Sequence, residues 1–116
     1  MNNLISLKKI SKNYILNNKV KALKNINFNF ELGKIYSIVG PSGSGKSTLL
    51  NILSLIDKPS SGNIRIDGKL IDFNNHDLND KIRASSIGII YQNYNLLPDF
   101  TALENVSLAA LAFNKN

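Results

Sequence analysis

The sequence predicts an α/β fold in which a buried strand, a glycine-rich loop and a helix follow one another. Residues 34–39 are largely apolar and β-branched, as in a strand that is covered on both faces. The next residues are rich in glycine, and residues 47–53 then carry apolar side chains at helical spacing. With 116 residues, of which 43% are hydrophobic and 19% are charged, the chain is suited to one small globular domain.

Antiparallel strands are expected ahead of the glycine-rich loop. Residues 4–14 alternate loosely between apolar and polar side chains, which predicts an edge strand, and a turn follows at 17–19. The asparagine-rich stretch at 20–30 places apolar side chains at every second position near its end. This spacing predicts a strand with one face in water.

Shorter elements are expected after the loop helix, which should end near residue 55, ahead of a proline and a glycine. Thr101 and Glu104 form a capping box, in which two side chains close the start of a helix. The remaining elements expected are a strand at 63–67 that turns back at Gly68, an amphipathic helix at 76–85, a second apolar strand at 87–91, a loop at 93–100 and a helix opened by Thr101.

The glycine-rich loop matches a phosphate-binding pattern. Residues 40–48 read GPSGSGKST, which fits the P-loop pattern G-x-x-x-x-G-K-[ST]. Glycines let the backbone curl around a phosphate, and the N–H groups at the start of the next helix attract an anion. Lys46 would place its charge between the β- and γ-phosphates of a nucleotide, and Ser47 would offer its hydroxyl to Mg²⁺. The alternative is a glycine-rich turn that binds nothing.

Composition excludes several classes of protein. The net charge of +6 comes from lysines concentrated near the N-terminus, and no arginine cluster is interleaved with aromatic residues, so no nucleic-acid partner is expected. Without cysteine there is no disulfide framework and no cysteine-based metal site. The N-terminus lacks the pattern of a signal peptide, and no apolar run approaches the ~20 residues that span a bilayer. A role at a membrane would therefore depend on a partner.

These features together resemble the nucleotide-binding subunit of ATP-binding cassette (ABC) transporters. Tyr14 stands ahead of the loop, where that family has an aromatic residue, and GPSGSGKSTLLNIL is similar to its P-loop and following helix. SSGNIRIDGK at 60–69 is similar to its β-hairpin segment. IGIIYQNYNLLPDFTALENV at 87–106 is similar to its strand, glutamine loop and first part of the helical subdomain. NLLP, TALENV and NILSLIDKPSSG most resemble the lipoprotein-release and macrolide-export group.

The resemblance implies a fold and a site. The fold would be the α/β P-loop NTPase core of an ABC ATPase, truncated, with an antiparallel β part at 1–33, the core through the glutamine loop at 34–92 and the start of the helical subdomain at 93–116. Tyr14 would stack on adenine, and Gln92 would be the catalytic residue that reaches Mg²⁺ and the attacking water. The other nucleotide-binding residues would be Gly40, Pro41, Ser42, Gly43, Ser44, Gly45, Lys46, Ser47, which would also bind Mg²⁺, and Thr48, which would bond to the α-phosphate.

The implied function is that of the ATP-binding subunit, which couples ATP binding and hydrolysis to transport. It would work in the cytoplasm at the inner face of the cell membrane, with a transmembrane permease subunit and a second ATPase subunit arranged head to tail. The family's LSGGQ signature, Walker B strand and switch histidine do not occur in these 116 residues. We therefore expect nucleotide binding with negligible hydrolysis by this chain alone, and a tendency to aggregate.

His76 is expected to be a surface loop residue. No metal is assigned to Asp57, Asp67, Asp72, Asp77 or Asp80.

Three other interpretations stay open. A truncated or split cassette would bind nucleotide at best and would have no independent activity. A P-loop enzyme of another kind, such as a nucleotide kinase, is disfavoured by the region around Gln92 and by the hairpin segment. A cassette ATPase that handles nucleic acid is suggested only by the charge of +6.

Overall fold

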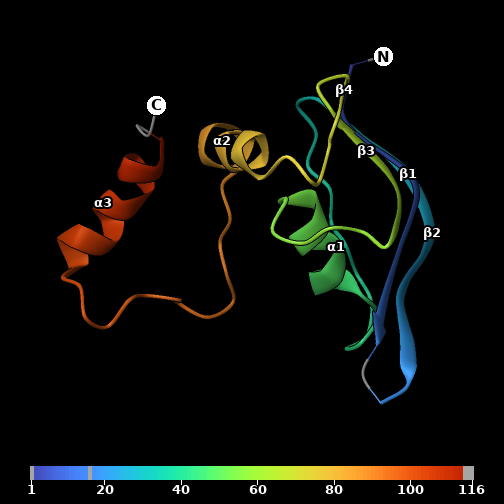
Figure 1. Cartoon of the computed structure of the whole chain (residues 1–116), viewed down its shortest axis with the longest axis horizontal. Coiled ribbons are helices and arrows are strands. Elements are labelled where there is room, and N and C mark those ends of the chain that lie inside the picture. The colour runs from blue at the N-terminus through green and yellow to red at the C-terminus, as the bar shows by residue number, and fades with distance from the viewer. Residues whose placement is uncertain (1, 16, 114–116) are drawn as a thin grey trace. The chain divides into compact units, whose positions relative to one another are not determined.

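The computed structural model describes residues 2–15 and 17–113, which form two compact units divided between Asn74 and Asn75. The first unit contains a sheet and one helix, and the second contains two helices (Figure 1). The predicted division at 1–33, 34–92 and 93–116 stays a prediction, because a compact unit need not coincide with a subdomain. The elements are β1 (Asn3–Ile15), β2 (Lys19–Glu31), α1 (Lys46–Leu53), β3 (Ser61–Ile66), β4 (Lys69–Leu70), α2 (His76–Ser86) and α3 (Ala102–Phe113).

The sheet of the first unit is antiparallel throughout, in the order β2-β1-β3-β4 (Figure 1). The prediction that residues 4–14 form an edge strand is wrong, because β1 pairs with β2 on one side and with β3 on the other. The loose alternation of β1 has a local cause. Lys9 has a φ of 54°, and the register shifts between Leu7 and Ile10 as it does at a β-bulge. The predicted return of the chain at Gly68 is confirmed by the pairing of β3 with β4.

A small apolar core joins α1 to the sheet. Ile10 of β1, Ile52 of α1 and Ile64 of β3 are fully buried. Burying one such side chain contributes about 1.5–3 kcal/mol. The burial of Ile52 and the contact of α1 with β2 therefore stabilise the position of α1, and with it that of the glycine-rich loop, against the sheet. The other buried apolar residues are Leu7, Leu23, Leu55 and Ile71.

The two segments predicted as apolar core strands are irregular. Residues 34–39 and 87–91 form no strand, and Ile35 and Ile90 are fully exposed. Both strand predictions are wrong, because a strand needs hydrogen bonds to a neighbour and none of the described strands pairs with either segment. The first segment is held instead by Tyr36, whose ring packs edge-on against two phenylalanine rings of β2.

The predicted helices are confirmed, and local capping explains where two of them begin. The side chain of Asn75 accepts a hydrogen bond from the N–H of Leu78 at 3.2 Å and so caps α2. The capping box of α3 is closed in both directions. The N–H of Glu104 donates to Oγ1 of Thr101 at 3.1 Å, and the N–H of Thr101 donates to the Glu104 carboxylate at 2.8 Å. Within the described ranges, every helix is too short or too polar to cross a membrane.

Candidate functional site

The loop at 40–45 leads directly into α1 and leaves the start of that helix open. Gly43 and Gly45 have φ values of 80° and 96°, a left-handed conformation that favours glycine. The N–H of Ser44 donates to the carbonyl of Pro41 at 3.2 Å, which closes a turn. Among the described residues no side chain caps α1, in contrast to α2 and α3. The N–H groups of its first turn therefore have no partner within the helix and attract an anion.

Gly45 also sets how closely the loop approaches the sheet. A Cβ at this position would lie 2.5 Å from the backbone oxygen of Ala22 in β2 and 3.1 Å from the side chain of Leu23. The first distance is too short for a methyl group unless the backbone shifts, and the second requires the Leu23 side chain to move slightly. The glycine thus allows the start of α1 to rest directly against β2.

Lys46 folds back over the loop. Its Nζ donates hydrogen bonds to the carbonyl of Gly40 at 2.6 Å, to the carbonyl of Pro41 at 2.8 Å and to Oγ of Ser44 at 3.3 Å. The ammonium group therefore lies beside the backbone that the sequence assigns to phosphate binding. Neutral carbonyls are weaker partners for a cation than a phosphate would be. The loop thus presents a positive charge together with the free N–H groups of α1.

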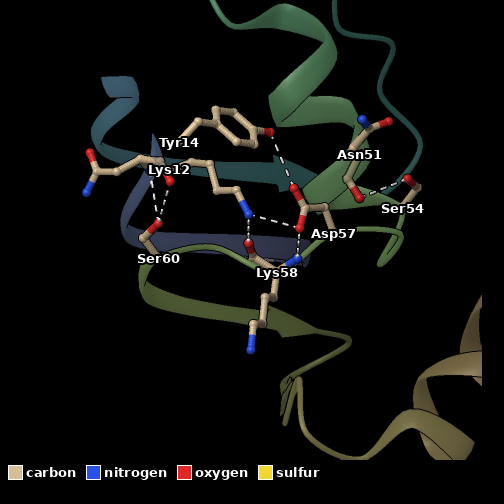
Figure 2. A network of polar contacts seen from close by, with 8 residues as sticks. Lys12, Tyr14, Asn51, Ser54, Asp57, Lys58 and Ser60 are labelled. Atoms are coloured by element: carbon tan, nitrogen blue, oxygen red, sulfur yellow. Dashed lines mark hydrogen bonds and ion pairs between the residues drawn. The ribbon is translucent and has the colours of Figure 1, made fainter. Parts of the chain in front are cut away.

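Tyr14 lies at the end of β1 and is half-buried, in the same unit as the loop. Its hydroxyl donates a hydrogen bond to Oδ2 of Asp57 at 3.3 Å (Figure 2). Nζ of Lys12 lies 5.1 Å from the centroid of the Tyr14 ring, within the range of a cation–π attraction. These two contacts fix the surroundings of the ring, and its stacking on adenine stays a prediction.

The neighbours of Asp57 favour its ionised form. Its Oδ1 lies 2.9 Å from Nζ of Lys12 and accepts a hydrogen bond from the N–H of Lys58 at 2.8 Å. Burial alone would raise the pKa of Asp57. The hydrogen bonds from Lys12, from the Lys58 backbone and from Tyr14, together with the Lys12 charge, outweigh burial and lower that pKa.

Sequence reasoning missed the role of Asp57. The residue stands 43 positions from Tyr14 and follows a helix close to a proline, which reads as a turn. The signal that was present is the i, i+2 spacing of Lys12 and Tyr14. This spacing places both side chains on one face of a strand, where the lysine needs an anionic partner.

Gln92 belongs to the second unit, on an exposed bend between α2 and α3. The loop that follows it is tied to α3 through Asn105. The N–H of Leu97 donates to the Asn105 side chain at 2.9 Å, and the amide of that side chain donates back to the Leu97 carbonyl at 3.2 Å. The predicted contact of Gln92 with Mg²⁺ and water stays a prediction.

The other polar residues considered from the sequence have ordinary structural roles. His76 is exposed, but it is the first residue of α2, so its assignment to a loop is wrong. Asp80 forms an ion pair with Arg83, and Asp72 accepts a hydrogen bond from the N–H of Asn74 at 3.0 Å. In the part of the chain that the structure describes, no three histidine, cysteine or acidic side chains gather as a metal site would require.

A glycine-rich loop that leads into an uncapped helix, with a lysine folded over the loop, defines a P-loop protein. Residues 23–116 match the ABC transporter family, and the chain belongs to that family. The resemblance inferred from the sequence is thereby confirmed.

Three relatives cover most of the chain. The ABC transporter ATP-binding protein MJ0796 of Methanocaldococcus jannaschii is 48% identical over 107 residues, which make up 90% of this chain and 45% of that protein. The lipoprotein-releasing system ATP-binding protein LolD of Rickettsia bellii is 41% identical over 99% of this chain and 50% of its own. The macrolide export ATP-binding/permease protein MacB of Mannheimia succiniciproducens is 42% identical over 98% of this chain and 18% of its own. These names agree with the predicted likeness to the lipoprotein-release and macrolide-export group.

A solved structure confirms the predicted fold. The dimeric structure of the cassette MJ0796 bound to ADP and Pi matches with a TM-score of 0.88 at 42% identity, over 97% of this chain and 49% of that chain. This chain therefore has the α/β fold of an ABC ATPase, with an antiparallel β part and helices. It spans about half the length of MJ0796 and LolD, 45% and 50% respectively.

Proposed function

We propose that this chain is part of the ATP-binding subunit of an ABC transporter and that residues 40–48 bind the phosphates of ATP. One observation carries the proposal. The uncapped start of α1 and the ammonium group of Lys46 lie on the same short loop. Together they offer N–H groups and a positive charge to a single anion. The names of the relatives as ATP-binding proteins support the choice of nucleotide.

The residues present suit ATP together with Mg²⁺. The loop N–H groups would hold the β-phosphate, Lys46 would contact the β- and γ-phosphates, and Thr48 would bond to the α-phosphate. Ser47, which is exposed on the first turn of α1, would offer its hydroxyl to Mg²⁺. When bound, Mg²⁺ neutralises charge on the β- and γ-phosphates. Tyr14 would stack on adenine, and Gln92 would orient the attacking water.

The proposed setting is the cytoplasmic face of the cell membrane. There the subunit would contact a transmembrane permease subunit and pair head to tail with a second ATPase subunit, so that ATP binding and hydrolysis drive transport. The names of LolD and of the ATP-binding/permease protein MacB support the permease partner. The dimeric structure of MJ0796 supports the second subunit.

Calorimetric titration with ATP and Mg²⁺ tests this proposal. The chain should bind ATP, and Lys46→Ala should weaken binding about tenfold to a hundredfold, because a hydrogen bond to a charged group contributes about 1.5–3 kcal/mol. Lys81→Ala is the matched control, since it removes an exposed lysine from α2 and should leave the affinity unchanged. Equal affinities of the unmodified chain and Lys46→Ala would contradict the proposal.

A further inference from the structure

The segment that follows α1 is fastened along the end of β1 (Figure 2). The N–H of Ser60 donates to the carbonyl of Ser11 at 2.9 Å, and the N–H of Asn13 donates to Oγ of Ser60 at 3.0 Å. The Ser60 hydroxyl donates back to the Asn13 carbonyl at 3.4 Å. Residues 57–60 are therefore bound to the part of β1 that carries Tyr14.

The same segment is fastened to α1. The carbonyl of Asn51 accepts hydrogen bonds from the N–H groups of Ile56 at 2.9 Å and Asp57 at 3.1 Å, and from the hydroxyl of Ser54 at 3.1 Å. Leu55 is buried and has a φ of 61°, and it forms the turn between α1 and the segment at 57–60. The backbone of Asp57 is thus placed by the helix whose other end carries the glycine-rich loop.

The side chain of Asp57 extends this connection to Tyr14. Oδ1 accepts hydrogen bonds from Nζ of Lys12 at 2.9 Å and from the N–H of Lys58 at 2.8 Å, while Oδ2 accepts one from the Tyr14 hydroxyl. Nζ of Lys12 also donates to the Lys58 carbonyl at 2.7 Å, and only 12% of the Lys12 side chain is exposed. The two members of this ion pair therefore contact Tyr14 at different points: Asp57 accepts a hydrogen bond from its hydroxyl, and Nζ of Lys12 lies over one face of its ring (Figure 2).

We propose that Lys12 and Asp57 are positioning residues that orient the Tyr14 ring for the base of the nucleotide. The inference rests on the proposed function, in which Tyr14 contacts the base and the loop contacts the phosphates. Lys12 covers one face of the ring, so a purine stacks on the opposite face. A ring already held in its binding orientation loses less freedom when the base arrives. Because Asp57 is also bound to α1, the ring and the phosphate loop keep a fixed separation.

Two ligands separate the contribution of the base from that of the phosphates. ATP carries both, whereas inorganic tripolyphosphate carries phosphates alone, and both are titrated with Mg²⁺. The ratio of the two Kd values reports the base contact. Asp57→Ala should reduce the preference for ATP about three- to tenfold, a part of the ten- to hundredfold that one stacked base contributes. It should leave the affinity for tripolyphosphate unchanged. Asp80→Ala, which disrupts the Asp80–Arg83 ion pair of α2, is the matched control.

Two further comparisons show whether the pair acts through Tyr14. Tyr14→Phe keeps the ring and removes the hydroxyl, so Asp57→Ala should reduce the preference for ATP less in that background. Lys12→Ala should reduce the preference, and Lys12→Arg, which keeps a cation, should restore most of it. A merely structural role would lower the affinities for ATP and tripolyphosphate together.

The outcomes distinguish this inference from the proposed function. If Tyr14→Ala reduces the preference for ATP and Asp57→Ala does not, the positioning role is overturned and the proposed function stands. Equal losses of both ligands in Asp57→Ala also overturn the positioning role. If the chain binds no ATP, or if Tyr14→Ala leaves the preference unchanged, the proposed role of Tyr14 fails and the inference fails with it.

Discussion

The hydroxyl of Tyr14 donates a hydrogen bond to Oδ2 of Asp57 at 3.3 Å, across 43 positions of the sequence. The contact joins the end of β1 to the segment after α1. Since the N–H of Asp57 also donates to the carbonyl of Asn51 in α1, the aromatic residue is linked to the helix that begins at the glycine-rich loop. The two proposed contact points for a nucleotide, Tyr14 and the loop, are thus connected through one element.

The Lys12–Asp57 ion pair should make the free energy of unfolding of this chain depend on pH. Burial raises the pKa of Asp57, but the hydrogen bonds to its carboxylate and the charge of Lys12 lower the pKa by more than burial raises it. The pKa in the folded chain therefore lies below the usual value. A lowered pKa adds stability that is complete above the unfolded pKa of about 3.9 and is lost as the pH falls through the folded pKa. At about pH 7, Asp57→Asn should lower the free energy of unfolding by about 0.5–1 kcal/mol, a small value because the pair is partly exposed to solvent.

Denaturant titrations of the chain and of Asp57→Asn measure this effect at neutral and acid pH. The difference between the two free energies of unfolding should shrink as the pH falls below about 4. A difference that stays constant over this range would show that the charge of Asp57 has no part in stability.

Among the glycines of the loop, Gly45 is predicted to be the one at which substitution by alanine is most destabilising. Gly45→Ala forces a side chain into a φ of 96° and places its Cβ 2.5 Å from the Ala22 oxygen. We expect Gly45→Ala to lower the free energy of unfolding by about 2–5 kcal/mol, because backbone strain and overpacking add together. Gly68→Ala is the control, because Gly68 has a φ of 75° but open space around an added Cβ, and about 1–2 kcal/mol is expected there. Thermal unfolding followed by circular dichroism compares the two, and equal losses would refute the close approach of the loop to β2.

The capping box predicts that Thr101 stabilises α3. Thr101→Ala removes the hydroxyl that accepts a hydrogen bond from the N–H of Glu104, and should destabilise the helix by about 1 kcal/mol. Ser107→Ala is the control, since Ser107 donates to the Leu103 carbonyl inside the helix at 2.7 Å, a bond that adds little. Helix content measured by far-ultraviolet circular dichroism should fall for Thr101→Ala and hold for Ser107→Ala. The opposite order would contradict the assigned cap.

Local patterns predicted the parts of the fold that depend on short-range contacts. The capping box of Thr101 and Glu104 and the turn at Gly68 need only neighbouring residues, and both are found. The same holds for the loop before Lys46, because its glycines and the helix start follow from a few adjacent residues.

Long-range pairing could not be predicted in the same way. Whether residues 4–14 are an edge or an inner strand depends on β3, which lies far along the chain. The apolar character of residues 34–39 indicates burial but does not supply a neighbouring strand. Asp57 was missed for the same reason, because its partners Lys12 and Tyr14 are brought to it only by the pairing of the segment after α1 with β1.

The most direct test of the proposed phosphate site is an amide NMR titration of the chain with ATP and Mg²⁺. The largest shifts should fall on the N–H groups of residues 43–48 and should be lost in Lys46→Ala. Tripolyphosphate should reproduce them, while shifts around Tyr14 should require ATP. Shifts centred on the exposed lysines Lys8 and Lys9, with residues 43–48 unchanged, would show that anions bind only to the basic surface and would contradict the proposed site.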